Sequence, residues 1–230
     1  MRLELVSLTG ADDLVKVDDL NSIIDQYHFA EFALLLMPEA MGQNRFPGLS
    51  WIYDFKTNFK GKHTAMHLCG SAFIDFCNGS LETKELIKGF KRIQLNLNFG
   101  DVAGKYDPEK MVTQIQNHPE ITFIIQYESA NASVLQKLKN INNHALLFDS
   151  SAGQGISPKA WPSPLDDHLC GYAGGINPEN IIPTIKAIKD VIPSDYSTWI
   201  DMETGIRTND HFDISKVHSV LDQARPYIAS

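Results

Sequence analysis

Long apolar runs are missing from this sequence of 230 residues, and so is an excess of positive charge. No stretch approaches the roughly 18 apolar residues of a membrane-spanning helix, so we expect no membrane partner. The residues after Met1 contain no apolar signal-peptide core, and we therefore expect a cytoplasmic protein. The balance of 20 basic against 28 acidic residues, a net charge of −8, argues against nucleic acid as the main partner.

Cysteine is also scarce. Cys69, Cys77 and Cys170 are an odd number of thiols and form no Cys-x-x-Cys pair. Such a set provides neither a disulfide framework nor a zinc-binding cluster. We expect three reduced thiols packed as small apolar groups, no bound metal and no cofactor.

Strand and helix patterns alternate eight times along the chain. Short apolar runs predict strands at residues 3–8, 32–37, 64–69, 93–97, 121–125 and 145–148, and two more that end near residues 173 and 202. Apolar residues at helical spacing and helix-start signals predict helices at residues 17–27, 49–59, 71–78, 81–90, 108–115, 130–138, 178–188 and 213–224.

This spacing leaves no room for antiparallel hairpins, and no linker or low-complexity tract divides the chain. The sequence contains eight predicted strands, and a helix follows the last of them. The sequence therefore predicts an α/β fold, a single-domain (β/α)8 TIM barrel over residues 1–230, rather than a doubly wound open sheet.

The seventh predicted strand leads into a glycine turn that is suited to an anion. Gly174 and Gly175 allow the backbone to approach a ligand closely. We expect Asn177 to cap the following helix and Pro178 to be its first residue, which would leave free N–H groups and a positive dipole end near the turn. A phosphate or carboxylate is the ligand that such a turn favours.

The eighth predicted strand ends in a second small turn, at Thr204 and Gly205. In parallel barrels, the loops after the seventh and eighth strands commonly hold a phosphate. We therefore predict that main-chain amides of the two turns converge on one phosphate group.

The run from Gly174 to Ile181 resembles the corresponding signature of phosphoribosylanthranilate isomerases, the (β/α)8 enzymes of tryptophan biosynthesis. Three further features fall in the expected order: residues 146–150 with the glycine loop after them, residues 201–206, and a final helix opened by an acidic residue. The resemblance covers about the last third of the chain, from about Ala145 onward.

The resemblance implies a phosphorylated sugar as the substrate and a role for particular residues. Asp149, at the end of the sixth strand, matches the general acid of the family. Arg45, in the loop after the second strand, resembles the arginine that binds the anthranilate carboxylate. The residues assigned to the phosphate, including two glycines from the loop after Asp149, are Gly153, Gly155, Gly174, Gly175, Thr204 and Gly205.

The first strand departs from the family pattern. Family members carry a cysteine general base there, and aligning Thr9 with the family's threonine places Val6 at the cysteine position. An Amadori rearrangement needs a base for the sugar carbon and an acid for the ring oxygen, and neither Val6 nor Ser7 is an equivalent base. The chain therefore resembles a divergent member of the family.

His67 and Cys69 alternate on the third predicted strand, so both can face the barrel mouth. Two such residues are too few for a convincing zinc site. We assign His67 to substrate binding and Cys69 as a substitute for the missing base. The alternative is that His67 makes one buried polar contact and that Cys69 packs as a small apolar side chain.

The fourth and fifth predicted strands also carry polar residues. Gln94, Asn96 and Asn98 alternate on the fourth strand, and Gln126 and Glu128 end the fifth. We expect Asn96 and Gln126 to orient the hydroxyls of a sugar. The alternative is that they form hydrogen bonds with one another or with neighbours as a polar layer inside the barrel. Glu128 is a second candidate for the base. The alternative interpretation is that Glu128 is a solvent-exposed residue of a loop.

The sequence thus predicts an isomerase of a phosphorylated sugar, with that small molecule as its partner, acting as a monomer or homodimer. A first alternative is an epimerase or aldolase on another phosphosugar, although no lysine at a predicted strand end offers Schiff-base chemistry. A second alternative is a non-catalytic barrel that only binds a phosphate ligand.

Overall fold

The computed structural model describes residues 1–97, 102, 104–127, 132–149 and 155–229. Eight parallel strands form a closed barrel in the order of the sequence, with β1 paired to both β2 and β8. The strands of the barrel are β1 (Arg2–Thr9), β2 (Ala30–Leu36), β3 (Thr64–Leu68), β4 (Arg92–Leu95), β5 (Thr122–Tyr127), β6 (His144–Asp149), β7 (Cys170–Ala173) and β8 (Ser197–Met202). The predicted (β/α)8 barrel is confirmed.

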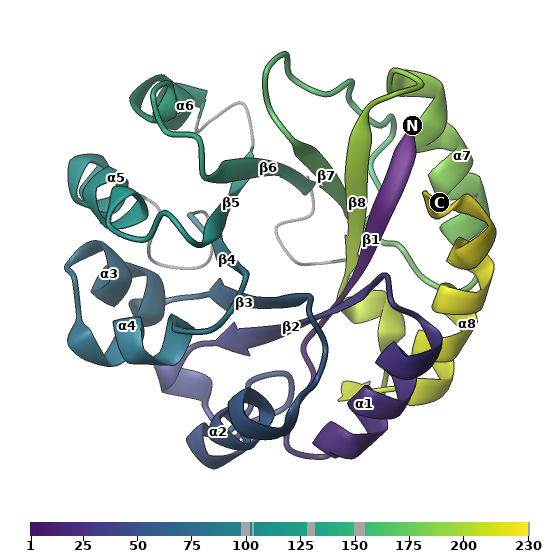
Figure 1. Ribbon diagram of the computed structural model, residues 1–230, viewed down its shortest axis with the longest axis horizontal. Helices are drawn as coiled ribbons and strands as arrows, with labels where there is room; N and C mark the ends of the chain where they lie inside the picture. Colours follow the sequence, from purple (N-terminus) through teal and green to yellow (C-terminus); the bar gives the residue numbers. More distant parts are fainter. Residues whose placement is uncertain (98–101, 103, 128–131, 150–154, 230) are drawn as a thin grey trace.

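Helices surround the barrel, as Figure 1 shows. The α-helices in the described part of the chain are α1 (Val17–Gln26), α2 (Leu49–Asn58), α3 (Ser71–Cys77), α4 (Leu81–Ile87), α5 (Pro108–Gln116), α6 (Ala132–Leu138), α7 (Ile181–Val191) and α8 (Ile214–Ala224). Each of these helices is too short or too polar to span a lipid bilayer. Short 3-10 turns are η1 (Pro38–Ala40), η4 (Thr204–Ile206) and η5 (Arg225–Tyr227).

Each strand of the barrel presents one face to the helices and the other to the barrel interior. On β2, Phe32 and Leu34 belong to the large apolar cluster that joins the strands to the helices. A second, smaller cluster, which includes Ile124, Leu147 and Trp199, fills the interior. Because both faces are covered, every residue of β2 is buried, and this explains why all of its residues except Glu31 are apolar.

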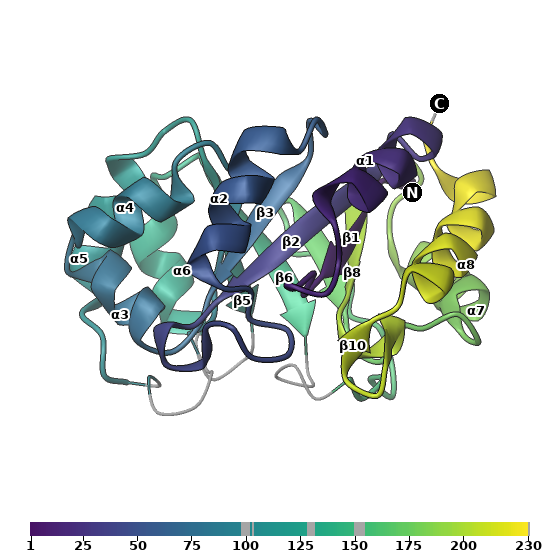
Figure 2. The same ribbon diagram turned by 90° about the horizontal axis from the view of Figure 1, so that it is seen from below.

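The two edges of the barrel differ. The chain termini lie at the upper edge in Figure 2, whereas the arrow of β6 points to the lower edge, where β10 also lies. All eight strands run in the same direction, so their carboxyl ends gather at that lower edge. In parallel barrels this is the edge that carries the active site.

One local prediction was wrong. The chain makes a small antiparallel hairpin from β9 (Arg207–Thr208) and β10 (His211–Phe212), although the strand spacing had been taken to leave no room for hairpins. Asn209 and Asp210 both adopt positive φ angles, of 53° and 60°, as the tight turn between paired strands requires. The hairpin lies within the connection from β8 to α8 and leaves the barrel topology unchanged.

Candidate active site

Polar side chains occupy the barrel interior near the carboxyl ends of the strands. Each of Gln126, Asp149 and Asp201 lies two residues beyond a member of the interior apolar cluster on the same strand, and each is at least nine-tenths buried. Because alternate residues of a strand face the same side, these three side chains point into the barrel above its apolar layer. The mouth of the barrel is therefore lined by groups that can bind or exchange protons.

The two glycine turns after β7 and β8 are in direct contact. A Cβ atom added to Gly205 would lie 1.9 Å from the carbonyl oxygen of Ile176, directly after Gly174 and Gly175. Only glycine fits at position 205, and the two turns are packed against each other. None of the hydrogen bonds between described residues uses the N–H of Gly174, Gly175 or Gly205.

The start of α7 differs from the prediction. The helix begins at Ile181, and Asn177 instead caps a preceding turn, where its side chain accepts hydrogen bonds from the N–H groups of Glu179 and Asn180. The side-chain amides of Asn177 and Asn180 donate to the carbonyl of Gly175, at 3.3 and 2.7 Å. The N–H groups of Glu179 and Asn180 are thus already occupied, so an anion at this place would depend on the glycine turns themselves.

Gly155 brings the loop after β6 to the same place. A Cβ atom on Gly155 would lie 3.0 Å from Cβ of Thr204, and one on Gly175 would lie 2.9 Å from the carbonyl oxygen of Gly155. Three of the predicted phosphate positions, Gly155, Gly175 and Thr204, therefore come together from three loops. Gly153 lies outside the described residues.

Asp149 lies beside the first of these turns. It is the last residue of β6, and a Cβ atom on Gly174 would be 3.7 Å from its Oδ1 atom. The side-chain amide of Gln126 lies 3.5 Å from Oδ2 of Asp149. The predicted acid, Asp149, and the predicted sugar ligand, Gln126, are therefore neighbours at the mouth, while Glu128 falls outside the described residues.

Asp201 is a functional candidate that the sequence places at a strand end but that is not among the predicted site residues. It lies on β8, and the hydroxyl of Thr9 donates a hydrogen bond of 2.6 Å to its Oδ1 atom. Burial raises the pKa of Asp201 to about 7, against the hydrogen bond from Thr9, and the charges of Glu203, Glu31 and Asp149 raise it further. The sequence signal was an alternating Asp-x-Glu pair at the end of a buried strand.

Arg45 reaches the barrel mouth but is held by two carboxylates. Its guanidinium lies 2.7 Å from Glu203 and 2.5 Å from Asp210, and its Nη1 atom lies 3.5 Å from the hydroxyl of Thr204. Burial opposes the charge of Arg45, but the contacts with Asp210 and Glu203 outweigh it and raise its pKa. Burial raises the pKa of Glu203 although Arg45 is paired with it.

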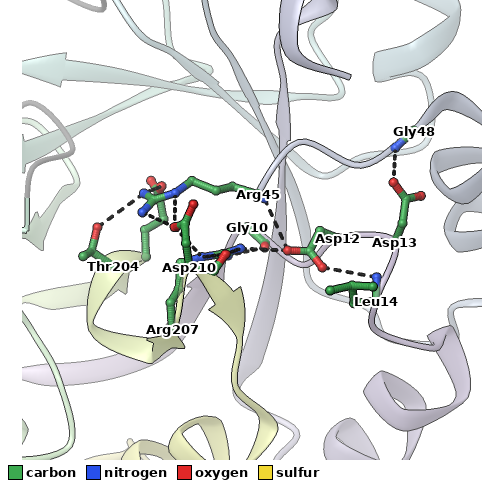
Figure 3. A network of polar contacts seen from close by, with 10 residues as sticks. Gly10, Asp12, Asp13, Leu14, Arg45, Gly48, Thr204, Arg207 and Asp210 are labelled. Atoms are coloured by element: carbon green, nitrogen blue, oxygen red, sulfur yellow. Dashed lines mark hydrogen bonds and ion pairs between the residues drawn. The ribbon is translucent and has the colours of Figure 1, made fainter. Parts of the chain in front are cut away.

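A network of ion pairs joins the loops after β1, β2 and β8, as Figure 3 shows. The buried guanidinium of Arg207 contacts a carboxylate oxygen of Asp12 at 2.7 Å and the carbonyl of Gly10 at 2.6 Å. The same carboxylate oxygen of Asp12 accepts a hydrogen bond from the backbone N–H of Arg45. This network fixes the loop that carries Arg45 relative to the second glycine turn.

The polar residues at the ends of β3 and β4 are bonded to one another. Gln94 donates to Asn96 at 2.7 Å, and Asn96 donates to the sulfur of Cys69 at 3.0 Å. Burial raises the pKa of the Cys69 thiol to about 12, and burial lowers the pKa of His67 to about 3. At neutral pH the thiol is protonated and the imidazole is neutral, so the geometry does not favour Cys69 as a base.

No group of three or more histidine, cysteine or acidic side chains in the described ranges is arranged to hold a metal ion. His67 and Cys69 lie two residues apart, and the described contacts of the thiol are with Asn96 and with the carbonyl of His67. The three cysteines are all buried free thiols, as expected.

The first strand offers no proton acceptor at the position of the family's cysteine. Val6 faces outward and is buried in the cluster between barrel and helices. The hydroxyl of Ser7 donates to the buried carboxylate of Glu31 instead. Neither Val6 nor Ser7 is therefore placed to act as a base at the barrel mouth.

Comparisons with known proteins complete these observations. The chain matches the family model of "N-(5'phosphoribosyl)anthranilate (PRA) isomerase" over residues 91–223, which is more than half of its length. A comparison with curated protein sequences gave no match at a significant level.

Solved structures share the fold. A phosphoribosyl anthranilate isomerase from Thermus thermophilus has 17% sequence identity and a TM-score of 0.64, covering 98% of this chain and 99% of its own. A form of the dimeric enzyme from Thermotoga maritima, engineered as a monomer, has 15% identity and a TM-score of 0.61 over 97% and 99% of the two chains. For the enzyme from Pyrococcus furiosus the values are 15% and 0.56, over 96% and 98%. The family match over residues 91–223 shows that this chain belongs to the phosphoribosylanthranilate isomerase family.

Proposed function

We propose that the protein catalyses the Amadori rearrangement of N-(5′-phosphoribosyl)anthranilate, in which a phosphorylated aminoaldose becomes an aminoketose. The family supports an isomerase of this kind. The proximity of Asp149 to the glycine turn at Gly174 is the observation that carries the proposal, because it puts an acid next to an anion-binding position. One substrate that bears a phosphate and a sugar ring can occupy both.

In this proposal the substrate phosphate binds to the N–H groups of Gly174, Gly175 and Gly205. The contact between the two turns supports this role, since their amides belong to one continuous surface. Backbone amides in a fixed loop bind a phosphate without a cation, which suits a chain with a net charge of −8. Gly155 and Thr204 complete the wall of the phosphate site.

Asp149 then serves as the general acid that protonates the ring oxygen of the ribose. Protonation opens the ring and gives an iminium at the sugar's first carbon. Gln126, next to Asp149, is suited to binding a hydroxyl of the opened sugar. Removal of the proton on the second carbon yields an enolamine, whose tautomerisation gives the ketone.

Arg45 is the proposed ligand of the anthranilate carboxylate. Its partner Asp210 has a side chain that is 44% exposed, whereas its other partner, Glu203, is 22% exposed. The substrate carboxylate can therefore replace Asp210 at the guanidinium from the solvent side. Arg45 would remain paired with Glu203 throughout, which fixes its position.

Purified protein should convert phosphoribosylanthranilate to the aminoketose, and the gene should restore growth of a tryptophan-requiring strain that lacks the isomerase. Asp149→Asn should lower kcat by a factor on the order of 10² to 10⁴ while phosphate binding persists. Asp195→Asn, a change of the same kind at an exposed position, is the matched control and should keep full activity. Full turnover by the Asp149→Asn variant would exclude the acid role.

A non-catalytic phosphate-binding barrel is the second candidate. The observation that favours it is that Ser7 and Thr9, the polar residues at the end of β1, both donate to carboxylates and so offer no base. The same experiment separates the two functions. Binding of inorganic phosphate without turnover or complementation would support the second candidate and exclude the first.

A further inference from the structure

The proposed isomerisation, on which this inference rests, needs a base that β1 does not supply. Val6 is buried against the helices, and Ser7 is bonded to Glu31. Thr9 faces the interior, but its hydroxyl is a donor to Asp201. The proton acceptor must therefore come from another strand.

Most other titratable groups at the mouth are unsuited to the task. Cys69 is a buried thiol that accepts a hydrogen bond from Asn96 but is protonated at neutral pH. Glu203 is paired with Arg45 at 2.7 Å. Glu31 lies 3.6 Å from Arg92 and accepts a hydrogen bond from Ser7, two residues deeper along β1 than Thr9.

Asp201 has the geometry of a partner for Asp149. The register of the sheet pairs Asp149 with Ala173 of β7, and pairs the same Ala173 with Asp201 of β8. The two aspartates therefore lie at the same level, two strands apart, and at most about 10 Å separates their backbones. Both side chains point into the mouth, so they face one ligand from two sides.

We propose that Asp201 is the general base of the isomerisation, in place of the first-strand cysteine of the family. Asp149 donates its proton to the ring oxygen, which becomes a hydroxyl as the carbon–oxygen bond breaks. Asp201 accepts the proton from the sugar's second carbon, and the electron pair of that bond neutralises the iminium. The enolamine then loses its hydroxyl proton and gains one at the first carbon, and solvent returns both carboxyl groups to their starting forms.

The surroundings of Asp201 suit a base that works near neutral pH. Its facing groups are the hydroxyl of Thr9 on β1 and three carboxylates, namely Glu203 directly after β8, Glu31 on β2 and Asp149 on β6. Burial and these negative charges raise its pKa to about 7, whereas Thr9 opposes the shift. A base with a pKa near the working pH combines an ionised population with high basicity.

The test is the pH dependence of kcat/KM for the wild type and for Asp201→Asn. The wild type should show an ascending limb with a midpoint near pH 7. Asp201→Asn should lose that limb and lower kcat by a factor on the order of 10² to 10⁴, with KM little changed. Circular dichroism and the thermal transition would verify that the variant is folded.

A second measurement separates chemistry from structure. Asp201→Ala leaves a space beside Thr9 that formate can occupy, and added formate should restore part of the lost kcat. A purely structural role of Asp201 would give no such rescue. Asp195→Asn, at an exposed position outside the site, should keep the wild-type profile.

The outcomes distinguish this inference from the proposed function. If the wild type is active and the Asp201→Asn variant keeps both its kcat and the ascending limb of its pH profile, the role of Asp201 is overturned. The proposed function then still stands. If Glu128→Gln loses the ascending limb while Asp201→Asn keeps it, the role of Asp201 is also overturned, and Glu128 becomes the general base. A wild type that binds phosphate but isomerises nothing between pH 5 and 9 overturns the proposed function, and the role of Asp201 with it.

Discussion

Replacing Asp201 with Asn should make the protein more stable at neutral and alkaline pH. The carboxyl group is buried, and its pKa rises from 3.8 to about 7 in the folded state. The folded protein thus holds a proton on Asp201 in a pH range where the unfolded chain has lost it. The wild type therefore loses stability as the pH increases from about 4 to about 7.

The size of the effect follows from the shift. Roughly three pKa units at about 1.4 kcal/mol each correspond to about 4 kcal/mol at pH 8. Asparagine has no charge to bury, and its carbonyl oxygen can still accept the hydroxyl of Thr9. Its amide group adds buried donors that need acceptors, which costs about 1 to 3 kcal/mol if one stays unpaired. We expect a net gain of about 1 to 4 kcal/mol in the free energy of unfolding at pH 8.

Urea denaturation at pH 8 and at pH 4.5 measures this difference. The variant should exceed the wild type clearly at pH 8 and by much less at pH 4.5, where Asp201 is neutral in the folded state. Asp195→Asn, at an exposed position, should differ little from the wild type at either pH. An Asp201→Asn variant that is destabilised equally at both pH values would refute the reasoning, because it would mean that folding does not raise the pKa of Asp201.

Three further predictions concern packing and charge. Gly205→Ala should lower the Tm and weaken phosphate binding, as measured by calorimetry, because its Cβ would lie 1.9 Å from the carbonyl of Ile176; unchanged binding would mean that the two turns act separately. Arg207→Met should cost about 3 to 5 kcal/mol in urea denaturation, because it leaves the buried carboxylate of Asp12 without its charged partner and with only backbone N–H donors; a loss below about 1 kcal/mol would show that these donors and solvent are enough for Asp12. Cys69→Ala should keep its turnover at pH 7.5, since burial keeps the thiol protonated; a drop of about 10² or more would restore Cys69 as the base.

The barrel could be predicted because its signals are local. A continuous apolar run such as residues 32–36 is typical of a parallel strand that is covered on both faces. The start of α7 was misjudged for a local reason as well. The side chain of Asn177 does cap N–H groups, but those of a turn that precedes the helix, and a sequence pattern does not distinguish the two.

The candidate site was only partly predictable. That the turns at Gly174 and Gly205 lie together follows from the adjacency of β7 and β8 in any eight-stranded barrel. The pairing of Arg45 with Asp210 does not follow, because it depends on how two long loops meet. The role proposed for Asp201 was missed because its pKa depends on burial and on carboxylates from other strands, which only the folded chain brings together.

The most direct test of the account is an amide NMR titration of the wild type with inorganic phosphate and with a phosphorylated sugar. We predict that the resonances of Gly174, Gly175 and Gly205 shift together and saturate with one Kd. We also predict that a phosphorylated sugar shifts the resonances of Asp149 and Asp201, whereas inorganic phosphate affects them less. Glycine resonances that stay unmoved, or that saturate at different concentrations, would contradict the claim that the two turns form one phosphate site beside a pair of catalytic aspartates.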